Sequence, residues 1–168
     1  MDWRDRYAGS EILVADDMPF SRSMIARFLE RPDGPRLSYV DNGADALAEL
    51  DSDAGRDIHL LVTDFYMPVI NGLDLVLRIR SGRTAARYDM AVVMVTSEAD
   101  STLTEAAGQF DVDAVLVKPI SRGALNGAVD AALARSGLRR SPQDYAAAEI
   151  PALGRWLDSE SRCGARRR

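Results

Sequence analysis

The chain has 168 residues, enough for one domain of ordinary size, and its 46% hydrophobic and 28% charged residues are typical of a globular protein rather than a disordered or fibrous one. No apolar run approaches the about 20 residues that cross a bilayer, and Met1–Gly9 lacks the hydrophobic stretch of a secretory signal. The single cysteine, Cys163, and the acidic excess of residues 1–138 favour a cytoplasmic protein that does not bind DNA directly.

Short apolar runs alternate along the chain with longer amphipathic segments, which is typical of parallel βαβ units. The predicted strands are Ile12–Ala15, Leu37–Val40, Leu60–Thr63, Ala91–Val95 and Ala114–Val117. The predicted helices, which carry apolar residues at helical spacing, are Ser21–Arg31, Ala44–Leu50, Leu73–Arg80, Leu103–Phe110 and Ala124–Ala134. Leu37–Val40 alone has the mixed composition of an edge strand, whereas the other four runs are apolar enough to be covered on both faces.

This alternation predicts an α/β fold with a flavodoxin-like, doubly wound, five-stranded parallel sheet of strand order 2-1-3-4-5. We expect the sheet and its helices to form one domain over residues 10–137, after an N-terminal extension of residues 1–9. Residues 138–168 then form a C-terminal extension that is partly helical and has a basic end.

Two features of the C-terminal extension indicate structure. Ser141-Pro142-Gln143-Asp144 has the layout of a helix start, with a cap, a first-turn proline and an acidic third residue. Beyond Pro151, an apolar stripe of Leu153, Trp156 and Leu157 could pack either on the domain or on a partner.

Carboxylates end two strands that are neighbours in the predicted sheet. Asp16 and Asp17 follow the first strand and Asp64 ends the third, at the edge where ligands bind in such sheets. Two carboxylates ~4 Å apart repel by about 4 kcal/mol at an effective dielectric constant near 20, so the group must take up protons or share a cation. Oxygen ligands favour Mg²⁺, with Mn²⁺ as the substitute, over zinc. Asp16 and Asp17 alone could merely cap the next helix, but Asp64 is separated from its helix by a loop containing Pro68 and Gly72.

A hydroxyl and an ammonium group are predicted at the same edge. The fourth strand runs into Thr96, which taken alone is most often just a β-former. The fifth strand is followed by Lys118, the only lysine of the chain, and a lysine can pair with both a carboxylate and a phosphoryl group.

Together with these residues, the run Asp64–Gly72, Asp-Phe-Tyr-Met-Pro-Val-Ile-Asn-Gly, resembles the acceptor loop of the receiver family of two-component signalling. The family loop has an aspartate, two variable residues, Met-Pro and a glycine. The resemblance covers roughly residues 10–135. It implies a response regulator in which Asp64 accepts a phosphoryl group from a phosphohistidine donor.

The resemblance also assigns roles to residues. It implies that Asp17 and Asp64 bind Mg²⁺ directly, that Asp16 acts through water, and that the Tyr66 carbonyl is a further ligand. Thr96 and Lys118 then bind the phosphoryl group, and the Lys118–Pro119 peptide bond is cis. Such a protein is not an enzyme with an output domain, although it supports Mg²⁺-dependent self-phosphorylation and autodephosphorylation.

The partners implied are a histidine kinase or histidine phosphotransfer protein as donor, a downstream protein target, and a second copy of the chain bound through Leu103–Phe110, Ala114–Val117 and Ala124–Ala134. No membrane is implied. Val115 stands where many receivers carry an aromatic switch residue, so we expect output to depend on the loop Thr96–Asp100.

Two alternatives are weighed against phosphorylation. A receiver-like scaffold or adaptor that is not phosphorylated would not need the complete set of chemical residues found here. A haloacid-dehalogenase-type phosphohydrolase would require a second acid where Tyr66 stands.

Overall fold

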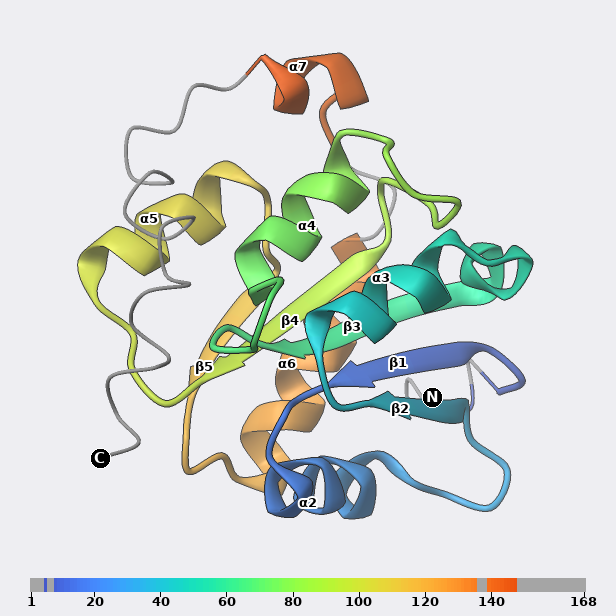
Figure 1. The fold of residues 1–168 in the computed structure, drawn as a ribbon. Coiled ribbons are helices and arrows are strands. Elements are labelled where there is room, and N and C mark those ends of the chain that lie inside the picture. The colour runs from blue at the N-terminus through green and yellow to red at the C-terminus, as the bar shows by residue number, and fades with distance from the viewer. Residues whose placement is uncertain (1–4, 6–7, 136–138, 148–168) are drawn as a thin grey trace.

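The computed structural model describes residue 5 and residues 8–135 and 139–147, in which strands alternate with helices (Figure 1). The strands are β1 (Glu11–Ala15), β2 (Arg36–Val40), β3 (Ile58–Asp64), β4 (Ala91–Thr96) and β5 (Ala114–Val117). The helices are α2 (Pro19–Leu29), α3 (Gly43–Asp51), α4 (Gly72–Arg80), α5 (Ser101–Gln109), α6 (Arg122–Arg135) and α7 (Pro142–Ala146). A 3₁₀ helix, Asp53–Asp57, was not predicted.

The strands form one five-stranded sheet of order β2-β1-β3-β4-β5 in which every pairing is parallel. This confirms the predicted fold class and strand order. The register pairs Ala15 with Thr63 and Asp64 with Val95, so the carboxyl ends of the three central strands lie level. Residues that follow these strands therefore meet at one edge of the sheet.

Successive side chains of a strand point to opposite faces, and each face of the sheet has its own core. Leu13 and Leu61 pack with α3, α4 and α5 on one face. Ile12 and Leu60 pack with α2 and α6 on the other face. Figure 1 shows these two helical layers on either side of the sheet.

The expectation of burial on both faces is wrong for β5. Ala114, Val115 and Leu116 are only half-buried, and Val117 is 50% exposed. In this strand order β5 is an edge strand like β2, so one side of it has no neighbouring strand to cover it.

Local signals explain where the helices begin. Pro19 occupies the first turn of α2, which starts two residues earlier than expected because proline fits a helical first turn. The Asp100 carboxylate accepts the Leu103 N–H and so starts α5 at Ser101.

The helix predicted at Ser141 is present as α7, and its capping box pairs Ser141 with Asp144. The predicted stripe of Leu153, Trp156 and Leu157 lies outside the described residues. Among the described helices, none is both long enough and apolar enough to cross a bilayer.

Candidate phosphoacceptor site

Three carboxylates meet where β1 and β3 end. Oxygens of Asp16, Asp17 and Asp64 lie within 4.8 Å of one another. Asp16 is fully buried and Asp64 is 5% exposed, whereas Asp17 is half-buried. The strand order thus brings together the acids that the sequence predicted to converge.

Asp16 holds the start of α2 and the lysine in place. Its Oδ1 accepts the Met18 N–H at 2.8 Å, and its Oδ2 accepts the Ser21 hydroxyl at 2.5 Å and the Lys118 ammonium at 2.8 Å. Both oxygens are therefore engaged by protein groups. Asp16 thus contacts the start of α2 through Met18 and Ser21, but it is not the N-cap of this helix, which is Met18.

Lys118 reaches the cluster from the end of β5. Its Nζ lies 2.8 Å from Asp16 Oδ2 and 3.2 Å from Asp64 Oδ2. The Lys118–Pro119 peptide bond is cis, as expected. Although burial lowers the pKa of Lys118, hydrogen bonds and charge from the two aspartates raise it overall, so the ammonium remains charged.

The acceptor candidate has an unusual electrostatic environment. Burial raises the pKa of Asp64 to about 6, and the positive charge of Lys118 only partly offsets this while Asp16 adds to it. The pKa of Asp17 is also raised, by burial and by the charge of Asp16. The negative charge of the three clustered carboxylates therefore favours binding of a cation.

The donor set fits Mg²⁺. Within the part of the chain that the structure describes, Asp64 Oδ1 is buried and has no hydrogen-bond partner. A buried carboxylate oxygen without a partner is costly, and a hard cation bound by neighbouring carboxylates would satisfy it.

The loop after Asp64 depends on a glycine. A Cβ on Gly72 would lie 2.3 Å from the Asp64 carbonyl oxygen, so no side chain fits there without movement of the acceptor strand. The Gly72 N–H donates to the Phe65 carbonyl at 2.9 Å and closes the loop. Tyr66 is 39% exposed and meets the buried Phe65 ring edge-on, with 4.6 Å between ring centroids.

Thr96 ends β4 but its hydroxyl is turned to its own loop. The Thr96 Oγ1 donates to the Glu98 carbonyl at 2.8 Å and accepts the Glu98 N–H at 3.3 Å. The structure thus brings the three acids and Lys118 together, and it places the Thr96 hydroxyl in a turn with Glu98 instead of in a hydrogen bond to Asp64.

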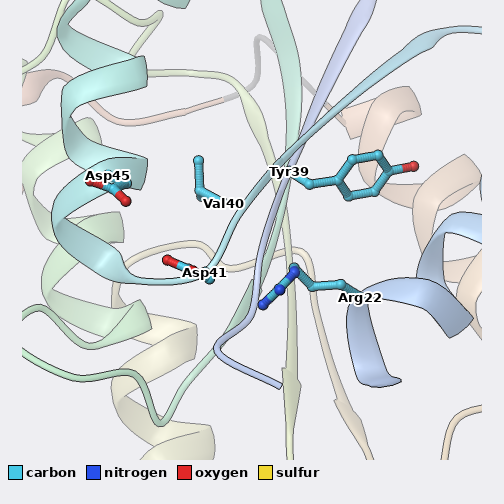
Figure 2. A pocket seen from close by; sticks show the side chains of 5 residues that line it. All are labelled: Arg22, Tyr39, Val40, Asp41 and Asp45. Atoms are coloured by element: carbon cyan, nitrogen blue, oxygen red, sulfur yellow. The ribbon is translucent and has the colours of Figure 1, made fainter. Parts of the chain in front are cut away.

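Sequence reasoning missed two neighbours of the acids, Ser21 and Arg22. The Arg22 guanidinium donates to the Asp16 carbonyl at 2.5 Å and also lines an open pocket beside the site (Figure 2). Asp41 and Asp45 lie across this pocket from Arg22, and Tyr39 and Val40 complete its lining. Ser21 and Arg22 are ordinary polar residues in the first turn of a helix, so only the fold reveals their proximity to Asp16.

The parallel sheet and the acid–lysine cluster at its carboxyl edge define a receiver-type domain. The chain belongs to the response regulator receiver domain family, whose family model matches residues 12–130.

Named relatives agree with this assignment. The chain is 32% identical over 112 residues to chemotaxis protein CheY1 of Helicobacter pylori, an alignment that covers 66% of this chain and 86% of the relative. It is 32% identical over 109 residues to two-component response regulator ORR3 of Oryza sativa subsp. indica, covering 65% and 79% respectively. A receiver domain crystal structure from Clostridium thermocellum has a TM-score of 0.66 at 26% identity, covering 77% of this chain and 98% of that one.

Proposed function

We propose that this chain is a phosphorylation switch of a two-component system, in which Asp64 accepts a phosphoryl group from a phosphohistidine donor. The observation that carries the proposal is the position of Asp64: a buried carboxylate beside Asp16, Asp17 and Lys118, with one oxygen that no described residue binds. The chain then signals through contacts with other proteins.

The chemistry assigns each residue a task. The Asp64 carboxylate attacks phosphorus, the bond to the donor nitrogen breaks, and an acyl phosphate forms. Lys118 neutralises negative charge on Asp64 and on the incoming phosphoryl oxygens. Asp17 and Asp64 and the Tyr66 carbonyl would hold Mg²⁺ or Mn²⁺, with Asp16 acting through water because its oxygens already accept protein hydrogen bonds. The cation, when bound, neutralises charge on the transferring oxygens.

Thr96 couples phosphorylation of Asp64 to a change in the loop that precedes α5. When its hydroxyl donates to a phosphoryl oxygen, it leaves the Glu98 carbonyl that it binds at 2.8 Å. The turn at Glu98 then rearranges, and this turn leads through Asp100 into α5. Val115 is partly buried and is not aromatic, so the signal in this chain passes through the loop and α5.

The biological setting follows from this role. The donor is a histidine kinase or a histidine phosphotransfer protein, and the output is a downstream protein target or a homodimer formed through α5, β5 and α6. The receiver domain spans residues 10–137, acts in the cytoplasm and does not bind DNA. Beyond self-phosphorylation and autodephosphorylation, the chain performs no catalysis of its own.

Beryllofluoride, which mimics a phosphoryl group on a carboxylate, tests the proposal without a donor protein. Beryllofluoride with Mg²⁺ should raise the melting temperature of the wild-type chain and leave that of Asp64→Asn unchanged. Asp130→Asn, the same substitution at an exposed position of α6, should respond like the wild type. An equal shift in Asp64→Asn would reject Asp64 as the acceptor, and no shift in the wild type would favour the unphosphorylated scaffold.

A further inference from the structure

Residues 139–147 form a strap at the edge of the sheet opposite the acid site. The strap contains α7, which lies against the carboxyl end of α4 (Figure 1). Its residues contact Asp111 and Asp113, which connect α5 to β5. Nothing in the proposed phosphoryl-transfer chemistry requires these contacts, because Asp16, Asp17 and Asp64 lie at the other ends of the strands.

The first anchor of the strap is a buried ion pair. Arg139 pairs with Asp113, and both side chains are only 1% exposed. The other Asp113 oxygen accepts the Val92 N–H at 2.9 Å, so the pair is tied to the start of β4. Breaking a buried pair leaves an uncompensated charge, which makes this anchor costly to release.

The second anchor holds the end of α5. The Tyr145 hydroxyl donates to Asp111 Oδ2 at 2.6 Å, and the Tyr145 side chain is fully buried. Arg140 lies 3.3 Å from the same carboxylate oxygen and also donates to the Gln109 carbonyl. The Arg140 guanidinium stacks over the Tyr145 ring, 4.6 Å from its centroid, so the two side chains support each other.

Arg80 binds the same end of α5 from within the protein core. It is fully buried at the end of α4 and donates to the carbonyls of Phe110 at 3.1 Å and Asp111 at 3.0 Å. Two further donations, to the carbonyls of Tyr88 and Met90, use the same guanidinium. Burial and the charge of Arg139 lower the pKa of Arg80 to about 10, which leaves it charged at neutral pH.

The two ends of α5 thus differ in the hydrogen bonds that hold them. Its carboxyl end is bound by Arg80, Arg140 and Tyr145, whereas its amino end follows the turn that Thr96 makes with Glu98. A rearrangement of that turn that displaces α5 would strain or break the bonds at the far end of the helix. A contact that is better made in one state than in the other shifts the equilibrium between them.

We propose that the strap is a built-in restraint: it holds α5 in the position seen here and so opposes the phosphorylated state. This inference rests on the proposed function. Weakening the strap should then make α5 easier to move and make the activated state easier to reach.

Two variants and one matched control test the strap. Tyr145→Phe removes the hydroxyl that binds Asp111, and Arg140→Ala removes the cation. Arg31→Ala is the control, because Arg31 pairs with Asp5 at the same 3.3 Å but at the end of α2, far from the strap. Hydrogen exchange of α5 amides in the full chain without ligand measures the restraint, and the beryllofluoride concentration at half-saturation with Mg²⁺ measures its effect on activation.

We expect the α5 amides of both strap variants to exchange faster than those of the wild type. Both variants should also reach half-saturation at roughly three- to tenfold lower beryllofluoride concentration. This change corresponds to part of the free energy of one hydrogen bond to a charged group. Arg31→Ala should change neither. Unchanged α5 exchange in both variants would overturn the restraint. Faster exchange with unchanged or weaker beryllofluoride binding would overturn its opposition to activation. Wild-type protein that does not bind beryllofluoride would instead overturn the proposed phosphorylation.

Discussion

Asp64 has properties that depend on its position in the fold. Burial raises its pKa to about 6 even though Lys118 contributes a positive charge 3.2 Å from one of its oxygens, which lowers the pKa. The other oxygen is left without a partner among the described residues, which makes it available to a cation or a phosphorus atom. The buried Asp64 carboxylate therefore lowers the stability of the fold, and its free oxygen suits it to phosphoryl transfer.

Tyr66 should control the lifetime of the acyl phosphate. It lies two residues after Asp64, and its ring can shield the acyl phosphate from attacking water. We predict that phosphorylated Tyr66→Asn loses its phosphoryl group several-fold faster than the wild type, because the smaller side chain admits water. The decay is followed after removal of acetyl phosphate. Tyr88→Asn replaces a tyrosine of similar exposure, 37% against 39%, and should decay like the wild type; equal lifetimes for all three proteins would contradict the shielding role.

Asp111 should make the stability of the fold depend on pH. Burial raises its pKa, but the hydrogen bond from Tyr145 and the charge of Arg140 outweigh burial and lower it below its usual value. The stabilisation that ionised Asp111 gives the fold is therefore complete above the pKa of about 3.9 that this group has in the unfolded chain. It is lost as the pH falls through the lower pKa of Asp111 in the folded protein. We predict that the difference in free energy of unfolding between wild type and Asp111→Asn, measured in urea, stays constant from about pH 7 to about pH 5 and shrinks as the pH falls below about 4. A difference that stays constant also below about pH 4 would argue against these contacts.

The strands were predictable because the signal for each of them is local. Ala91–Val95 is a continuous apolar run, and β4 is buried along its whole length. The apolar composition of β5 wrongly indicated burial on both faces, although the predicted strand order already places this strand at an edge of the sheet. The strap was missed for a related reason: Arg139 and Arg140 look like solvated charges until the fold places Asp111 and Asp113 beside them.

Gly72 joins the acceptor strand to α4, and its substitution should damage both. Gly72→Ala would place a Cβ 2.3 Å from the Asp64 carbonyl oxygen, so the end of β3 must shift. We predict a loss of about 2 kcal/mol or more in the free energy of unfolding, measured by denaturant titration, and weaker beryllofluoride binding.

Gly127→Ala is the matched control for Gly72→Ala. Gly127 lies within α6, and a Cβ there meets nothing within 4 Å. Alanine should stabilise this helix by roughly 0.5–1 kcal/mol, because glycine has the lower helix propensity. The account of the acceptor loop fails if the two substitutions have the same effect.

At the scale of the whole molecule, strand order converts distant residues into one site. Asp16, Asp64 and Lys118 are far apart in the sequence, and the parallel sheet brings their strand ends to the same edge. This convergence was predictable from strand order and from the resemblance to receivers. The hydrogen bond of Thr96 to Glu98 was not, because it depends on the conformation of a loop that carries no distinctive sequence signal.

Phosphorylation by acetyl phosphate tests the central claim most directly. The wild-type chain, incubated with acetyl phosphate and Mg²⁺, should gain one phosphoryl group by intact-mass spectrometry, and peptide mapping should locate it at Asp64. Asp64→Asn and wild type without Mg²⁺ should gain little or none, whereas Asp130→Asn should be labelled like the wild type. A phosphoryl group on another residue, or equal labelling of Asp64→Asn, would contradict the account.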